Sequence, residues 1–215
     1  MDPKQIVAQG YDHIAEYHSQ WASRTRTEER QRYTNLLLDS LPPAAKVLEL
    51  GCGVGLPTTL ALAQRFQVTG IDISARHVAL AQHNVPNATF VHADMTRLTF
   101  PSACFDAVAA FYSIIHVPRE EHPDLLRTLA TWLKPGGLFV AAMGSTAVEA
   151  QLSPHWLGAP MYWSHFESQT NQRLIQESHL QILSAKEETA EEDGVPVTFL
   201  WVVAQKPLSQ ERGSL

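Results

Sequence analysis

The sequence predicts an α/β fold, a doubly wound and mostly parallel sheet with helices on both faces. Short apolar runs alternate with helical segments, and strands connected in this way pair in parallel and are covered on both sides. A glycine-rich turn directly follows the first run, as expected at the carboxyl edge of such a sheet, where ligands bind. The predicted strands are 46–50, 67–72, 88–92, 105–111 and 138–143.

The helices between these strands are expected at about 57–65, 75–83 and 119–133. Upstream, residues 4–40 show apolar side chains at three- and four-residue steps, and Pro42-Pro43 end the second helical segment. We therefore expect residues 1–43 to form a helical cap on a core of residues 44–206. An insert at about 145–167 interrupts the core.

The C-terminal part predicts a helix at 168–178 and two strands at 180–188 and 195–205. The acidic turn Glu191-Glu192-Asp193-Gly194 between the strands is typical of a hairpin. Residues 207–215 lack apolar periodicity and are expected to form a frayed tail.

The composition of the chain argues against some classes of partner and location. The chain has 215 residues and a net charge of −6, with no Lys/Arg-rich run, so a nucleic-acid backbone is not expected as a partner. No segment approaches the ~18 apolar residues of a membrane span, and no signal region is evident. The two cysteines, Cys52 and Cys104, are expected to be reduced thiols of a cytoplasmic protein. Oligomeric state is left open.

The glycine spacing after the first strand distinguishes two classes of cofactor. Gly51, Gly53 and Gly55 stand at every second position, whereas a dinucleotide loop would need its third glycine at the place of Leu56. Glu49 stands just before the glycines. An acid there suits a ligand with an ammonium end and no pyrophosphate, which predicts S-adenosylmethionine (SAM).

Five segments in order resemble the motifs of class I SAM-dependent methyltransferases. They are ELGCGVG at 49–55, VTGIDIS at 68–74, ADM at 93–95, FDAV at 105–108 and WLKPGGL at 132–138. The resemblance implies a seven-stranded Rossmann-like sheet of order 3-2-1-4-5-7-6 with strand seven antiparallel. It also implies SAM as methyl donor, S-adenosylhomocysteine (SAH) as product and a small-molecule acceptor methylated on N, O, S or C.

Several cofactor contacts are expected from the motifs. Asp72 ends the second strand and can accept bonds from the ribose hydroxyls, although it could also cap the next helix, a role that Ser74 fills better. Asp94 is expected at the adenine amine and Met95 on the ring, unless Met95 is core filler. Ile73 is expected on the other adenine face. The remaining cofactor residues are Gly51, Cys52, Gly53, Gly55 and Phe111, together with Glu49, which either fixes the loop through backbone N–H groups or meets the ammonium through water.

The residues after the fourth strand should border the methyl-transfer site. A His116 with a near-neutral pKa could act as a general base, or its ring could simply support the loop before Pro118. Phosphoethanolamine methyltransferases resemble this arrangement, with an N-terminal tyrosine latched onto the equivalent histidine. Tyr11 or Tyr17 could supply that tyrosine here.

The insert is rich in aromatic residues and histidines and is expected to be a substrate-facing lid, although it could merely exclude water from the cofactor. An aromatic cage for a cationic amine is one interpretation. His155 and His165 are ten residues apart and suggest no metal site. The substrate or lid residues are Tyr17, Trp21, Tyr112, Trp156, Tyr162, Trp163 and His165.

Three functions remain open from the sequence. The favoured one is transfer of a methyl group from SAM to a small molecule by in-line displacement. The others are a SAM-binding protein with a non-methylating or regulatory role, and a methyltransferase that modifies a protein.

Overall fold

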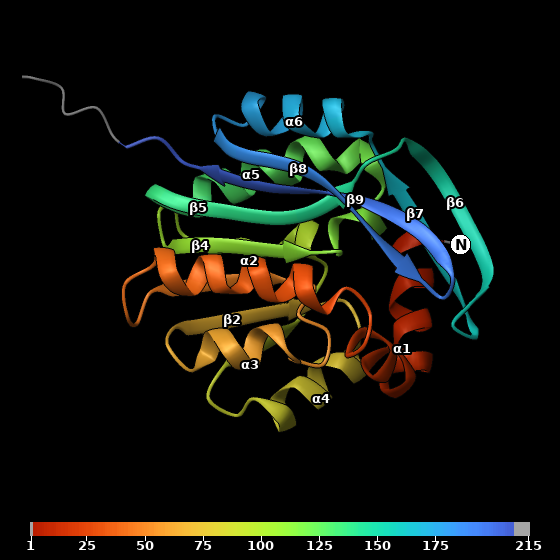
Figure 1. Ribbon diagram of the computed structural model, residues 1–215. Helices are drawn as coiled ribbons and strands as arrows, with labels where there is room; N and C mark the ends of the chain where they lie inside the picture. Colours follow the sequence, from red (N-terminus) through yellow and green to blue (C-terminus); the bar gives the residue numbers. More distant parts are fainter. Residues whose placement is uncertain (1, 209–215) are drawn as a thin grey trace, which may run out of the picture.

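The computed structural model describes residues 2–208, and its centre is a seven-stranded sheet of order β3-β2-β1-β4-β5-β9-β8 (Figure 1). Neighbours among the first five strands are parallel, and β9 enters antiparallel between β5 and β8. The predicted order is therefore confirmed, with β8 and β9 as the expected strands six and seven. The strands are β1 Lys46–Leu50, β2 Gln67–Asp72, β3 Thr89–His92, β4 Phe105–Phe111, β5 Leu133–Gly144, β8 Gln181–Glu192 and β9 Val195–Gln205.

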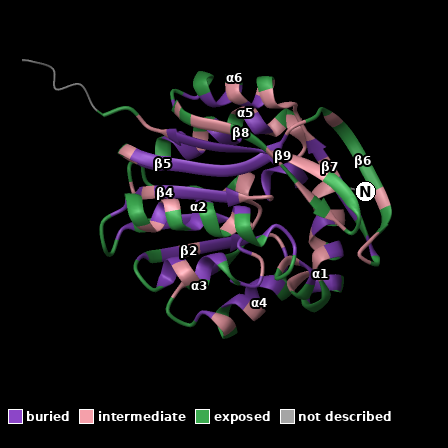
Figure 2. Ribbon diagram, in the orientation of Figure 1, coloured by how far each residue is buried: buried purple, intermediate pink, exposed green. Residues whose placement is uncertain are grey.

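Helices cover both faces of this sheet. Side chains of α2 (Thr27–Ser40), α3 (Thr58–Ala63) and α4 (Ala75–Asn84) join one core cluster, and those of α5 (His122–Trp132) and α6 (Ser168–Glu177) join the other. Figure 2 shows the central strands buried between these layers. Single turns of 3₁₀ helix lie at Met95–Arg97, Ile114–His116 and Arg119–Glu121.

The central strands are buried without alternation, as a parallel sheet covered on both sides requires. In β4 the run Ala107-Val108-Ala109-Ala110 has no exposed surface. Its small side chains point alternately toward the two helical layers, which lets helices approach both faces closely.

Several boundaries differ from the prediction. The strand expected at 180–188 continues as β8 to Glu192, into the predicted acidic turn. The expected helix at 119–133 is a 3₁₀ turn followed by α5, which starts at His122 with a proline in its first turn. Proline is favoured there because its missing N–H needs no partner. β5 starts at Leu133, where it already pairs with Phe105 across a bulge.

The insert, expected as a lid without an assigned secondary structure, is a separate two-stranded sheet of β6 (Val148–Trp156) and β7 (Ala159–His165). Leu157 and Gly158 both have positive φ, the conformation of a tight hairpin turn whose twist suits the flanking strands.

The N-terminal helix α1 (Pro3–Ala22) packs against this hairpin. Val7 and Ile14 form a small core with Met161 and Tyr162. Gly10 permits the contact, since a Cβ there would lie 2.5 Å from the carbonyl oxygen of Pro160. Helix and hairpin lie together at the end toward which the arrowheads of β2 and β4 point (Figure 1).

Among residues 2–208, no helix is long and apolar enough to cross a membrane. Of the expected frayed tail, residues 207 and 208 follow β9 without regular structure, and the rest lies outside the described residues.

Candidate functional site

The glycine loop after β1 is shaped by close packing on one side and open space on the other. Gly51 has φ +77°, and a Cβ there would lie 2.2 Å from Cβ of Ser113. The Ser113 hydroxyl donates to the carbonyl of Leu50 at 2.6 Å, which fixes this contact. Gly53, with φ +54°, has no atom within 4 Å of its virtual Cβ. The loop therefore exposes bare backbone to the space where a cofactor would lie.

Asp72 at the end of β2 ties this loop to the start of α4. Its Oδ2 accepts from the Gly53 N–H at 2.8 Å and its Oδ1 from the Ser74 N–H at 2.9 Å. Burial raises the pKa of Asp72, but the nearby His77 ring and the bonds from these two N–H groups outweigh it and keep the pKa below its usual value. Ser74 supplies the side-chain cap of α4, so Asp72 is not needed for that role. Its ionised oxygens retain lone pairs for ribose hydroxyls.

A cavity of about 110 Å³ opens between this loop and α1. Most of the predicted cofactor residues line it, and α1 supplies one wall through Lys4, Val7, Tyr11 and His18. The predicted residues that line it are Gly51, Gly53, Asp72, Ile73, Asp94, Met95 and Phe111.

Three predicted cofactor residues do not line this cavity. Glu49 is buried and accepts a bond from the Thr59 hydroxyl at 2.6 Å, so it anchors the start of α3 and not the loop N–H groups. Burial raises the pKa of Glu49 to about 7. Cys52 belongs to the core beneath the loop, and Gly55 packs against α4 near Val85.

Asp94 lies at the other end of the cavity, and both of its carboxylate oxygens already accept hydrogen bonds from the protein. Its Oδ1 accepts from the backbone N–H and the hydroxyl of Thr96, and its Oδ2 from Lys4 Nζ at 2.9 Å. Lys4 also donates to Glu121 at 2.6 Å. The ammonium of Lys4 thereby ties α1 to the cavity rim, a role that no local sequence pattern indicated. The adenine contact of Asp94 stays a prediction.

Tyr11 and His116 meet at the far side of the cavity. The Tyr11 hydroxyl lies 2.9 Å from Nε2 of His116, and Nδ1 lies 2.7 Å from the carbonyl oxygen of Tyr162. A carbonyl only accepts, so Nδ1 carries the proton and Nε2 accepts from the tyrosine. Burial and the nearby Asp72 raise the pKa of Tyr11 well above its usual value, so Tyr11 remains a donor.

The expectation of a near-neutral pKa for His116 is wrong. Burial lowers this pKa to about 4, because a charged ring is poorly solvated there. The ring is neutral at pH 7 and links α1 to β7, which corresponds to the supporting role considered from the sequence. Its Nε2 lone pair faces the site but is occupied by Tyr11.

Two further histidines border the cavity and were missed by the sequence reasoning. His77 has 1% of its surface exposed, and neither ring nitrogen has a hydrogen-bond partner among residues 2–208. Its Nδ1 lies 3.4 Å from Asp72 Oδ1. His18 lies partly buried beside it, and the loss of solvation lowers the pKa of His18 to about 3. An orphaned ring nitrogen at the cavity wall fits a polar ligand such as SAM.

A second cavity of about 590 Å³ lies between α1, the hairpin and β9. It shares Tyr11, His18, Tyr112 and His116 with the first cavity, so these side chains separate the two spaces. Of the predicted substrate and lid residues, Trp21, Tyr112, Trp156, Trp163 and His165 line it.

The other two predicted lid residues lie elsewhere. Tyr162 is buried and supplies the carbonyl that binds His116. Tyr17 is 51% exposed and lines neither cavity, so Tyr11 and not Tyr17 is the partner of His116. Within residues 2–208, no three His, Cys, Asp or Glu residues are grouped as metal ligands.

Comparison with known proteins agrees with this site. A family profile described as "Methyltransferase domain" matches residues 47–137, which include the glycine loop, Asp72 and His116. A 27-O-demethylrifamycin SV methyltransferase of Amycolatopsis mediterranei is 34% identical over 152 residues, 61% of this chain and 55% of the relative. Residues 47–137 are therefore similar to a methyltransferase domain, and the whole sheet has the Rossmann-like fold of methyltransferases.

A 2-methyl-6-phytyl-1,4-hydroquinone methyltransferase of Synechocystis is 33% identical over 60% of this chain and 43% of its own length. The chain thus spans about half the length of these curated relatives.

Solved structures share the fold. The Burkholderia thailandensis 1,6-didemethyltoxoflavin-N1-methyltransferase, solved with 1,6-didemethyltoxoflavin and SAH, aligns at a TM-score of 0.68 and 19% identity, over 93% of this chain and 88% of its own. The [4+2]-cyclase SpnF aligns at 0.75 and 17%, over 96% of each chain. A methyltransferase and a cyclase both have this fold, so the function must be argued from the site.

Proposed function

We propose that this protein binds SAM in the first cavity and transfers its methyl group to a small organic acceptor in the second. The observation that carries the proposal is the common wall of Tyr11, His18, Tyr112 and His116. An acceptor in the larger cavity meets the cofactor only at this wall. Small-molecule methyltransferases among the relatives support the acceptor class.

The proposed chemistry is in-line displacement, for which SAM supplies an activated methyl group with its own leaving group. The protein then needs mainly to align two reactants and exclude water. Asp72 and the glycine loop are proposed to fix the ribose and amino-acid parts, and Ile73, Asp94, Met95 and Phe111 the adenine end. Residues 1–43 and the insert at 145–167 are proposed to close over a core of residues 44–206.

His116 is proposed as the base for a neutral acceptor. An acceptor hydroxyl or amine that displaces Tyr11 from Nε2 would offer its proton to that lone pair. The carbonyl of Tyr162, bonded to Nδ1, stabilises the positive charge that then develops on the ring. Tyr11 keeps the lone pair occupied until the acceptor arrives.

Incubating the purified protein with SAM and a metabolite library, with SAH measured by mass spectrometry, tests the proposal. We expect SAH together with one library compound that has gained a methyl group. The product should be absent in Gly53→Val, whose side chain would enter the open space above the loop. SAM binding without SAH formation from any compound would instead indicate a non-methylating role.

A further inference from the structure

Arg30, on the first turn of α2, lines the second cavity with part of its guanidinium unused. Its Nη1 donates to the carbonyl oxygens of Ala22 at 2.8 Å and Thr25 at 3.3 Å. These two bonds fix the side chain to the connection between α1 and α2. Nε and Nη2 have no acceptor among residues 2–208. They form one edge of the guanidinium, with two parallel N–H groups that match the two oxygens of a carboxylate.

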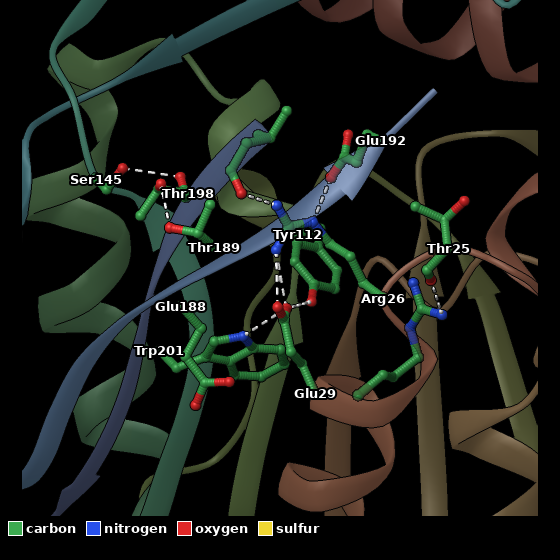
Figure 3. Close-up of polar contacts among 12 residues, drawn as sticks. Thr25, Arg26, Glu29, Tyr112, Ser145, Glu188, Thr189, Glu192, Thr198 and Trp201 are labelled. Carbon is green, nitrogen blue, oxygen red and sulfur yellow. Dashed lines mark hydrogen bonds and ion pairs between the residues drawn. The ribbon is translucent and has the colours of Figure 1, made fainter. Parts of the chain in front are cut away.

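The neighbouring Arg26 is, by contrast, fully paired. Its Nη1 donates to Glu29 at 2.9 Å, its Nε to Glu192 and its Nη2 to the carbonyl of Val197. Figure 3 shows the Arg26 guanidinium between the two carboxylates. The Glu29 carboxylate also accepts from Tyr112 and is therefore not available to Arg30.

Glu49 and Glu29 stabilise the positive charge of Arg30 without a hydrogen bond to it. Its guanidinium lies 5.5 Å from the Tyr112 ring centroid, so the Nε–Nη2 edge itself stays free of an acceptor among the described residues. Burial lowers the pKa of His18 to about 3 and that of His116 to about 4, and it also lowers the pKa of His165, so these rings are neutral at pH 7. Glu192 is paired with Arg26. Among the described lining residues, Arg30 is therefore a cation whose Nε and Nη2 donors have no acceptor. Partly buried N–H donors without an acceptor are costly unless a ligand supplies one.

Aromatic side chains form a large part of the remaining wall. They present flat apolar surfaces from α1, the hairpin and β9, and such surfaces favour a ring-bearing ligand body by stacking and edge-to-face contacts. The aromatic residues beside the Tyr11–His116 pair are Trp21, Tyr112, Trp156, Trp163 and Phe199.

We propose that the methyl acceptor is a ring-containing carboxylic acid whose carboxylate binds the Nε–Nη2 edge of Arg30. This inference rests on the proposed function and narrows its substrate class. One free guanidinium edge matches one carboxylate, whereas a phosphate monoester dianion would call for a second free cation. The same edge opposes the cationic amine considered from the sequence, because an ammonium has no acceptor to offer these N–H donors and would be repelled by the guanidinium.

Binding of three matched probes to the full chain saturated with SAH tests this assignment. The probes are 2-naphthoate, 2-naphthamide and 2-naphthylmethylamine, which share a ring body and carry a negative, zero and positive charge. Titrations are followed by tryptophan fluorescence, since Trp21, Trp156 and Trp163 line the cavity. We expect naphthoate to bind at least tenfold more tightly than either of the others.

Arg30→Gln should abolish that preference, so that naphthoate binds no better than naphthamide. Arg30→Lys retains the positive charge but lacks the two parallel N–H donors, so it should retain only part of the preference for naphthoate. Arg32→Gln is the matched control, because Arg32 is an exposed residue of the same helix that pairs with Glu188 at the surface. It should leave the preference unchanged.

Naphthamide or the amine binding as tightly as naphthoate would overturn the inference, as would no naphthoate binding at millimolar concentration. A preference that persists in Arg30→Gln would also overturn it. SAH affinity, measured separately for every variant, reports on folding and on the cofactor site. Failure to bind SAH would thus count against the proposed function, and loss of charge preference alone against the Arg30 assignment.

Discussion

The hydrogen bond between Tyr11 and His116 should control how readily α1 opens over the cofactor cavity. Tyr11→Phe removes the hydroxyl and retains the ring, which contacts the rings of His18, His77 and Trp156. The substitution thus isolates one bond, of 2.9 Å, between α1 and the loop after β4. Since α1 forms a wall of the cavity, we expect SAH to dissociate faster from the variant.

The magnitude follows from the burial of His116, which has 8% of its surface exposed. Without the tyrosine, Nε2 of the neutral ring is left without a partner, a cost of about 1–3 kcal/mol. If this cost falls on the closed state, the open fraction rises by roughly 5- to 150-fold, because 1.4 kcal/mol is a factor of ten. Water reaching Nε2 would bring the effect toward the lower value.

Stopped-flow displacement of SAH by excess SAM measures the dissociation rate. Tyr17→Phe is the control, since Tyr17 is an exposed tyrosine of the same helix that lines neither cavity, and its rate should equal that of the wild type. A dissociation rate for Tyr11→Phe within twofold of the wild-type rate would refute the reasoning.

Three further predictions concern packing and charge. Gly10→Val should push α1 away from β7, because its Cβ would lie 2.5 Å from the carbonyl oxygen of Pro160. We expect SAH to exchange faster from this variant, and an exchange rate equal to that of the wild type would contradict the packing argument. Arg26→Met should lower the free energy of unfolding by about 3–5 kcal/mol, because the carboxylates of Glu29 and Glu192 lose their cation. Urea denaturation measures this change, and a loss below about 1 kcal/mol would contradict the prediction. Stability should fall as pH drops below about 6.5, because His18, His116 and His122 have lowered pKa values in the folded protein and take up protons only on unfolding. Glu49, whose pKa is raised in the folded protein, has the opposite effect on stability. A melting temperature that is flat down to pH 4.5 would contradict the prediction for the three histidines.

The sheet could be predicted from the sequence because its signals are local. A run such as Ala107–Ala110 is apolar throughout and bounded by loops, and five family motifs fix the strand order. The insert was missed as a hairpin because its strands are mostly exposed and pack on α1, which is distant in the sequence. Only the Leu157-Gly158 turn gave a local signal.

The lining of the first cavity could be predicted where a motif fixes backbone geometry, as at Gly53 and Asp72. It could not be predicted where the contact joins distant segments. Lys4 reaches Asp94, and Arg26 is buried between Glu29 and the distant Glu192. The pKa of His116 likewise depends on enclosure by α1 and β7, which no spacing along the chain reveals.

Calorimetric titration of SAM into the wild-type protein and into Asp72→Asn tests the central claim most directly. The substitution is nearly isosteric, yet it removes the charge that would bind the ribose hydroxyls, a loss of roughly 1.5–3 kcal/mol. The account predicts one SAM bound per chain and at least tenfold weaker binding in the variant. No binding to the wild type, or equal affinity for both proteins, would contradict it.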